Sequence, residues 1–158
     1  MSHVVWRLAA DTPDYGADDL TGKGAEKTGG RWNRKGTPML YASDSIALAC
    51  LETTVHLGGA DPLPLNRYLV RIEIASSAWA ARTVFDAAQV GWDALPAGHV
   101  SIDWGTGWAQ SLRSLVAEVP SIVVPEESNA LINPRHPGAA QLSARKLRRW
   151  AFDRRLGS

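Results

Sequence analysis

Three side chains capable of polar chemistry lie within one stretch of the chain, GGRWNRKGTPMLYASDSIALACLETTVH, residues 29–56. Arg31 follows two glycines, which would let the backbone approach a ligand closely. Tyr41 contributes a ring with a hydroxyl group, and Glu52 contributes a carboxylate. A cation, an aromatic hydroxyl group and an acid set among glycines and apolar residues are candidates for a polar ligand-binding cleft.

Each of these residues also has an ordinary structural interpretation. On a predicted helix over residues 45–57, Glu52 lies four residues after Leu48 and three before Val55, so its carboxylate falls on an apolar stripe. A glutamate there either reaches water at the edge of the stripe or lines a cleft. Arg31 could equally be a surface loop residue, and Tyr41 could be a core residue with its hydroxyl group at the rim.

The elements that must position these residues follow from the local sequence pattern. Alternation predicts a strand over residues 4–9, with Arg7 on the face opposite Trp6 and Leu8. The Gly- and Asp-rich residues 11–30 predict a long loop. Residues 37–43 predict a strand with Met39 and Tyr41 on the same face, immediately before the helix over residues 45–57.

The remaining residues continue this mixture of strands and helices. The pattern predicts strands over residues 66–75 and 82–86, an amphipathic helix over 104–120, and short strands over 120–125 and 129–133. Residues 143–156 fit either a helix or a strand. Because no regular alternation of strand and helix is present, the sequence favours a mixed α+β fold over a doubly wound parallel sheet. A length of 158 residues favours one domain, residues 1–158.

Composition excludes several classes of protein. Hydrophobic residues make up 45% of the chain and charged residues 21%, which is typical of a globular protein rather than a disordered one. A net charge of +1 gives no global attraction to nucleic acid or to a membrane surface. The single cysteine, Cys50, cannot form an internal disulfide, which fits a reducing cytoplasm. Without an apolar run of about 18 residues, no membrane-spanning segment is expected.

Several common site motifs are missing from the sequence. The four histidines show neither HExxH nor Cys/His spacing, so no metal site is expected. No GxSxG elbow indicates a serine hydrolase, and no GxGxxG loop indicates a Rossmann dinucleotide site. The C-terminal tail, residues 143–156, is basic and could be a solvated face or a contact for a partner protein. Its few aromatic residues argue against direct binding of nucleic acid.

Four blocks, in this order along the chain, together resemble the RES domain family: WRLA, GGRWNRKGTPMLYASDSIALACLE, VPSIVVPEESNALINPRHP and FDRRL. The resemblance covers nearly the whole chain, and its GGRWN and NPRHP blocks are specific. The family is named for an arginine, a glutamate and a serine. Its arginine falls on Arg31, its glutamate on Glu52 and its accompanying tyrosine on Tyr41. Its serine falls on Ser121, with Ser128 as a second candidate.

The resemblance implies a toxin of a bacterial toxin–antitoxin pair that consumes NAD. It also implies a fold similar to that of diphtheria-toxin-type ADP-ribosyltransferases, with two packed, bent β-sheets flanked by helices. A cognate antitoxin, with a helix-turn-helix DNA-binding portion, would restrain the toxin. The complex, rather than this chain, would then bind DNA.

Chemical roles for the residues follow from this implied substrate. Cleavage of the nicotinamide–ribose bond passes through an oxocarbenium-like state, which the Glu52 carboxylate would stabilise. Arg31 would bind the pyrophosphate with its guanidinium fork, and the Tyr41 ring would line the nicotinamide or ribose. Ser121 would bond the carboxamide or position Glu52. Lys23 would contact a phosphate or remain solvated.

The acceptor of the ADP-ribose is not determined by these residues. Water would make the protein a glycohydrolase, phosphate a phosphorylase, and a protein side chain an ADP-ribosyltransferase. The open loop over residues 11–30 favours a protein acceptor. A different class of function also stays open, namely a non-enzymatic module that binds a partner or RNA through the basic tail.

Overall fold

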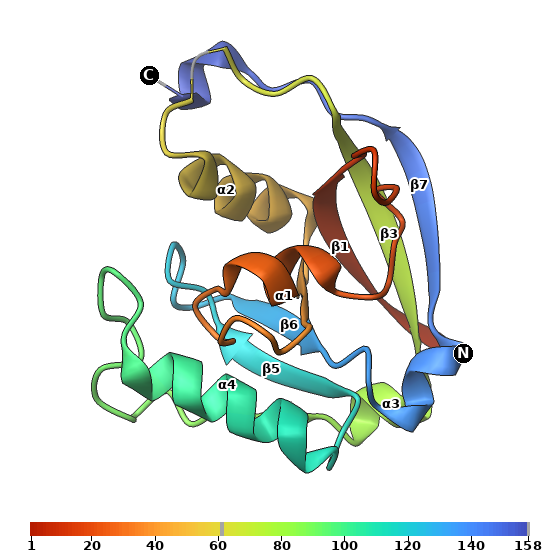
Figure 1. Cartoon of the computed structure of the whole chain (residues 1–158), viewed down its shortest axis with the longest axis vertical. Coiled ribbons are helices and arrows are strands. Elements are labelled where there is room, and N and C mark those ends of the chain that lie inside the picture. Colours follow the sequence, from red (N-terminus) through yellow and green to blue (C-terminus); the bar gives the residue numbers. More distant parts are fainter. Residues whose placement is uncertain (61, 158) are drawn as a thin grey trace.

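The strands of the computed structural model, which describes residues 1–60 and 62–157, form one sheet in the order β4-β5-β6-β2-β1-β3-β7 (Figure 1). Neighbouring strands are antiparallel except for β4 and β5. The strands are β1 (Ser2–Ala10), β2 (Leu40–Ser43), β3 (Arg67–Ala75), β4 (Thr83–Val84), β5 (Val116–Pro120), β6 (Ser128–Ile132) and β7 (Ser143–Arg149). The α-helices are α1 (Lys23–Thr28), α2 (Ile46–Leu57), α3 (Ser76–Ala80) and α4 (His99–Ser111), and 3₁₀ turns span Pro137–Gln141 and Arg154–Gly157.

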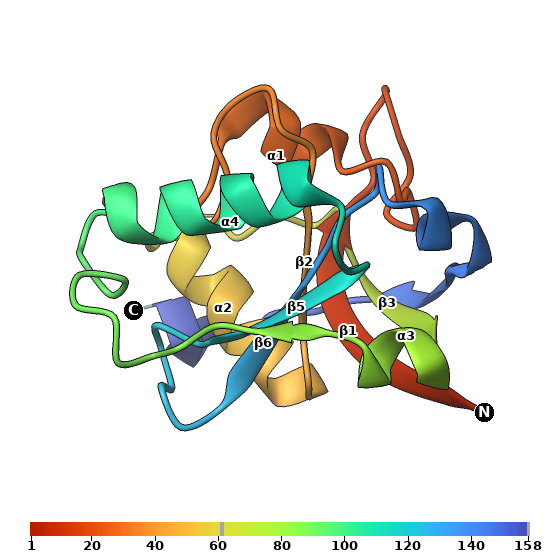
Figure 2. The same cartoon turned by 90° about the horizontal axis from the view of Figure 1, so that it is seen from below.

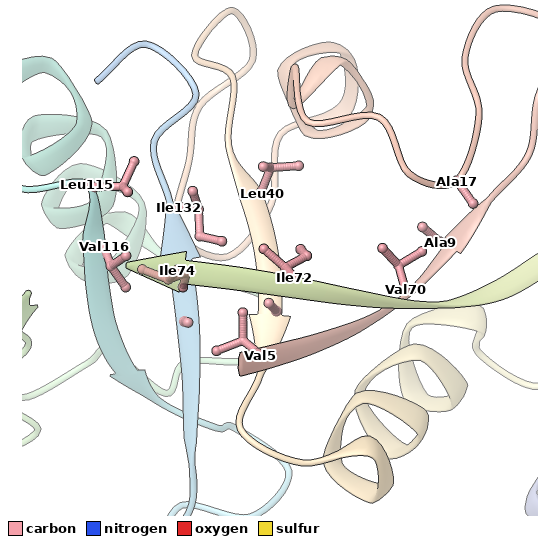
Figure 3. Close-up of a cluster of buried hydrophobic side chains, with 12 residues drawn as sticks. Val5, Ala9, Ala17, Leu40, Val70, Ile72, Ile74, Leu115, Val116 and Ile132 are labelled. Atoms are coloured by element: carbon pink, nitrogen blue, oxygen red, sulfur yellow. The ribbon is translucent and has the colours of Figure 1, made fainter. Parts of the chain in front are cut away.

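The sheet is bent into two halves that pack against each other. One half is β4-β5-β6-β2 and the other is β1-β3-β7. Among the residues that the structure describes, β1 and β2 join the two halves through the pair of Trp6 with Ser43. Because side chains alternate along a strand, each half turns one apolar face inward. Figure 3 shows Val5 and Ile72 from one half close to Leu40 and Ile132 from the other. The predicted α+β fold is confirmed, and its two packed layers are the halves of one continuous sheet.

Helices cover the outer faces of both halves. Figure 2 shows α4 running along β5 and β6. Trp108 and Ala109 of α4 belong to the same buried cluster as Val119 of β5 and Leu131 of β6. Against the β1-β3 half, α2 packs through Cys50. The longest described helix, α4, has 13 residues, and no described helix is long and apolar enough to cross a membrane.

The predicted helix over residues 104–120 is wrong in its second half. The helix ends at Ser111, because Leu112 takes a left-handed conformation with φ of 56° and terminates the hydrogen-bonding pattern. The chain then enters β5 at Val116. The predicted helix would place Trp108, Leu112, Leu115 and Val119 on one apolar stripe. In the structure Leu115 and Val119 are buried in the core of the sheet instead. The assignment to the core is therefore confirmed for Trp108, Leu115 and Val119 but wrong for Leu112, which is 46% exposed.

Three other segments differ from expectation or settle an open alternative. The strand predicted over residues 120–125 is wrong, because β5 ends at Pro120 and residues 121–127 form the turn between β5 and β6. The next predicted strand, over residues 129–133, corresponds to β6. The long loop over residues 11–30 contains the short helix α1. Of the basic tail, residues 143–156, the first half forms β7 at the edge of the sheet, and a 3₁₀ turn begins at Arg154.

Candidate active site

Glu52 is brought to the site by α2. The helix begins after Ser45, whose Oγ accepts the Leu48 N–H at 3.0 Å, and it ends at Gly58, where φ is 61°. The predicted apolar stripe is buried at Leu48 (1% exposed) but open at Val55 (58% exposed). Glu52 lies between these positions and is half-buried. It therefore sits where the stripe leaves the core, and its carboxylate turns toward the sheet.

The Glu52 carboxylate is held by two side-chain donors, one from the turn after β5 and one from β6. Its Oε1 accepts hydrogen bonds from Ser121 Oγ at 2.5 Å and from Asn129 Nδ2 at 2.7 Å. Ser121 is fully buried, and its Oγ also accepts the backbone N–H groups of Val123 and Val124 at 3.1 and 3.0 Å. Because a hydroxyl group has one proton, Ser121 gives that proton to Glu52. Of the two candidate serines, Ser121 makes this bond.

Tyr41 lies on β2 and supports the turn formed by residues 29–33, which we call the GGRWN turn. Its hydroxyl group donates to Asn33 Oδ1 at 2.5 Å and accepts the Trp32 N–H at 3.1 Å. Burial raises the pKa of Tyr41, so the phenol is neutral at physiological pH. A Cβ atom at Gly30 would lie 2.7 Å from this hydroxyl oxygen, which explains why the turn needs glycine there. The hydroxyl group of Tyr41 is therefore occupied by hydrogen bonds within the protein.

Arg31 projects from the same turn. Its Nη1 donates to the backbone oxygens of Trp92 and Ala94 at 3.0 and 2.9 Å. Its Nε and Nη2 make no hydrogen bond to any described residue. Burial lowers the pKa of Arg31, and the nearby charges of Glu52 and Asp93 act in the opposite direction. The guanidinium group is thus anchored at Nη1, while its Nε and Nη2 have no partner among the described residues. The negative charge of Glu52 is near enough to raise the pKa of Arg31 against the effect of burial.

Lys23 is not brought together with these residues. It is the first residue of α1. It lines a separate pocket of about 500 Å³, whose walls include neither Arg31 nor Glu52. The lining residues are Leu20, Thr21, Lys23, Glu26, Pro38, Pro134, Arg135, Ala139 and Ala140.

The arrangement combines an anchored carboxylate with a cation nearby. No ion pair within 4 Å joins Arg31 to Glu52 among the described residues. Each charge is therefore available to a ligand that carries both an anionic part and a centre where positive charge develops. Within the described part of the chain, no group of three or more His, Cys, Asp or Glu side chains could hold a metal ion.

Comparison with known proteins places the chain in a family. The family model described as the RES domain matches residues 4–155. The chain belongs to the RES domain family. A Sphingobium protein named Prs ADP-ribosylating toxin is 53% identical over 158 residues, covering 99% of this chain and 98% of the relative. A Yersinia enterocolitica protein named Toxin Res is 42% identical over 144 residues, covering 90% of this chain and 93% of the relative.

A solved structure shares the fold of this RES domain. It is the crystal structure of the M. tuberculosis MbcT-MbcA toxin-antitoxin complex, and its matching chain has a TM-score of 0.63. The match covers 99% of this chain and 87% of that chain, at 19% sequence identity. This likeness supports the fold of the RES domain described above.

Two residues of this site in the RES domain were missed by sequence analysis. Asn129 lies in a segment whose apolar neighbours suggested only a core strand, yet its side chain contacts Glu52. Asn33 is 1% exposed, and its Nδ2 donates to the backbone oxygens of Ala25, Arg34 and Thr37. A polar side chain at a position that should be buried was the available signal in both cases, because such groups need partners.

Proposed function

We propose that this chain is the toxin of a toxin–antitoxin pair, and that it cleaves the nicotinamide–ribose bond of NAD and transfers ADP-ribose to a protein. Residues 1–158 would act as a single catalytic domain in the cytoplasm. The observation that carries the proposal is the carboxylate of Glu52, fixed by Ser121 and Asn129 beside a partly free Arg31. Membership in a family with a 53% identical relative named as an ADP-ribosylating toxin supports the same reaction.

The chemistry requires stabilisation of positive charge more than proton transfer. The nicotinamide ring nitrogen is cationic in NAD, so when the bond to ribose breaks, the bonding electron pair neutralises the leaving group. Positive charge then develops on the ribose ring, and a nucleophile attacks its C1 atom. One carboxylate near the ribose suits this transition state, and Glu52 is the residue we assign to it.

Arg31 would bind the pyrophosphate. Its Nη1 is tied to two backbone oxygens, which fixes the guanidinium plane, while Nε and Nη2 can form the two parallel bonds that a phosphate accepts. The Tyr41 ring would line the nicotinamide or ribose. Ser121 would act through Glu52 rather than on the carboxamide, because its single proton is already donated. Lys23 faces a different pocket, so the phosphate contact is assigned to Arg31 alone.

A protein acceptor is the outcome we favour, because the relative that matches over nearly its whole length is named for ADP-ribosylation. Mass spectrometry of proteins from cells expressing the chain tests this assignment. We expect a peptide that carries one added ADP-ribose. Accumulation of only free ADP-ribose would instead indicate a glycohydrolase, and only ADP-ribose 1-phosphate would indicate a phosphorylase.

We also propose a cognate antitoxin as partner, with a helix-turn-helix portion that binds DNA. The toxin names of the two relatives support this partner. The chain itself would not bind nucleic acid directly. The first half of its basic tail is built into β7, in which Lys146 pairs with Asp11 at 3.0 Å and Arg148 lies over the ring of Trp150.

A further inference from the structure

We propose that Asn129 is a positioning residue, which together with Ser43 fixes the plane of the Glu52 carboxylate so that Oε1 is anchored and Oε2 faces the ribose. This inference rests on the proposed cleavage of NAD. It assigns a role to two residues that do not touch the substrate but determine how the catalytic carboxylate is presented.

The first step is the register of β2, β6 and β5. Asn129 of β6 lies opposite Ser43 of β2 on one side and opposite Val119 of β5 on the other. Because Ser43 and Tyr41 are two residues apart on β2, their side chains share one face of the sheet, which is also the face of Asn129 and Leu131. Asn129 therefore lies on an inner strand of the sheet, β6, which is hydrogen-bonded to β5 on one side and to β2 on the other.

The second step is the orientation of the Asn129 amide. Ser43 Oγ donates to Asn129 Oδ1 at 2.7 Å, and Ser43 is 3% exposed. This bond fixes the amide oxygen toward Ser43, so the amide NH₂ group must face Glu52. Asn129 Nδ2 then donates to Glu52 Oε1 at 2.7 Å. The result is a continuous chain of donors from the buried strand to the carboxylate.

The third step concerns the two oxygens of Glu52. Ser121 and Asn129 both donate to Oε1, while Oε2 accepts no hydrogen bond from any described residue. A single donor would leave the carboxylate free to rotate about that bond. Two donors, one from the turn after β5 and one from β6, define its plane. Because transition-state stabilisation depends steeply on geometry, loss of one donor should reduce turnover without removing a substrate contact.

The test compares Asn129→Asp with the wild-type chain in an assay of nicotinamide release from NAD. This substitution keeps the size of the side chain and the acceptor for Ser43, but it removes the donor to Glu52. We expect kcat to fall by about tenfold to a hundredfold, while the Kd for NAD, measured by calorimetry, changes by less than about threefold. At lower pH the two carboxyl groups can share a proton, so activity should partly recover there in this variant alone.

The matched control is Asn66→Asp, the same chemical change at an exposed residue whose amide donates to the Asp11 backbone oxygen. It should leave turnover and its pH profile unchanged. A second variant, Ser43→Ala, releases the amide of Asn129 without introducing charge. It should lower kcat by a smaller factor, with NAD affinity again retained, and it serves as the test if Asn129→Asp does not fold by circular dichroism.

The outcomes separate this inference from the function on which it rests. If the wild-type chain releases nicotinamide and folded Asn129→Asp releases it equally fast, the role of Asn129 is overturned and the function stays intact. If Asn129→Asp does not fold, normal turnover in folded Ser43→Ala has the same meaning. A loss of NAD affinity as large as the loss of kcat would make Asn129 a substrate contact and would also overturn it. Absence of nicotinamide release from the wild-type chain would remove both the function and the inference.

Discussion

Arg31 and Glu52 carry opposite charges and are held in place by different groups. Arg31 is anchored by two backbone oxygens through Nη1, and Glu52 by two side-chain donors through Oε1. Each residue has its own anchors, and no ion pair within 4 Å joins the two among the described residues. The remaining nitrogens of Arg31 and the second oxygen of Glu52 are then available for a dipolar substrate such as NAD.

Arg31→Ala should weaken NAD binding by about 2 to 4 kcal/mol, because charge-assisted, paired hydrogen bonds are among the stronger polar interactions. The fold should survive, since Arg31 is only partly buried. Isothermal titration with NAD measures the effect. Arg113→Ala, which removes an exposed guanidinium after α4, is the control and should bind NAD normally. Unchanged affinity in Arg31→Ala would show that the pyrophosphate lies elsewhere.

Tyr41→Phe should lower the free energy of unfolding by about 1 to 3 kcal/mol, because the Trp32 N–H and Asn33 Oδ1 each lose a partner. The pH dependence has a definite sign. Burial raises the pKa of Tyr41 above its ordinary value of 10.0, so the stability from the neutral phenol is complete below pH 10 and declines as the pH rises above it. Urea unfolding from pH 7 to 11 should therefore show a steeper decline in the wild type than in Tyr41→Phe. Parallel declines would contradict this role.

At the scale of elements, α4 approaches the GGRWN turn closely through one glycine. A Cβ atom at Gly105 would lie 1.8 Å from the backbone oxygen of Trp32 and 2.9 Å from its Cβ atom. At Gly107, in the same helix, a Cβ atom would meet no atom within 4 Å. The two positions thus form a matched pair, which differs only in whether the helix contacts the turn that carries Arg31.

Gly105→Ala should lower the free energy of unfolding by about 1 to 3 kcal/mol, the usual cost of overpacking. Gly107→Ala should raise it by about 0.5 to 1 kcal/mol, because alanine loses less backbone entropy than glycine in a helix. Thermal or urea unfolding of both variants checks this. Equal effects at the two positions would show that the close approach of α4 to Trp32 does not exist in solution.

Local sequence patterns predicted the elements that have a clear period. Alternation placed Met39 and Tyr41 on one face of the strand predicted over residues 37–43. The structure confirms β2 from Leu40, and both side chains pack in the cluster beneath α4. The helix around Glu52 was likewise predicted, and it spans Ile46–Leu57. The end of α4 could not be predicted, because its stop is a left-handed Leu112 rather than a glycine. The sequence carried no breaker there, so the apolar period extended into β5.

Residue types and the family resemblance predicted which residues could form the site, but not the contacts between them. The geometry brings Glu52 and Ser121 into contact across 69 positions of sequence. The sequence did not predict that Asn129 would join them, because this contact depends on the pairing of β6 with β2. Nor could it show that the Tyr41 hydroxyl group is used by the GGRWN turn, since its partners become neighbours only after the turn folds.

At the scale of the whole molecule, the site lies over one half of the bent sheet and depends on the other half for support. Glu52 comes from α2, which packs on the β1-β3 half, whereas Ser121 and Asn129 belong to the β5-β6 half. Among the described strands, the two halves are joined in register by the pair of Trp6 with Ser43. The position of the Glu52 carboxylate therefore depends on correct packing of both halves.

The proposed antitoxin leads to a prediction about cells. Expression of the chain alone should arrest growth, and co-expression with the adjacent reading frame should restore it, because a bound antitoxin would block access to the site. Colony counts and copurification measure the two effects. As a control, a Glu52→Gln chain should copurify with the antitoxin yet cause no arrest. Arrest that persists with the adjacent frame expressed would contradict the pairing.

The most direct test of the account is Glu52→Gln, assayed for nicotinamide release and for NAD affinity on the same preparation. The amide keeps the shape of the side chain but removes the negative charge that the transition state uses. We predict that turnover falls by about a hundredfold or more, while NAD still binds. A glutamate that only occupied the surface of α2 would change stability by about half a kcal/mol and turnover not at all. Near-normal nicotinamide release from the variant would contradict the central claim.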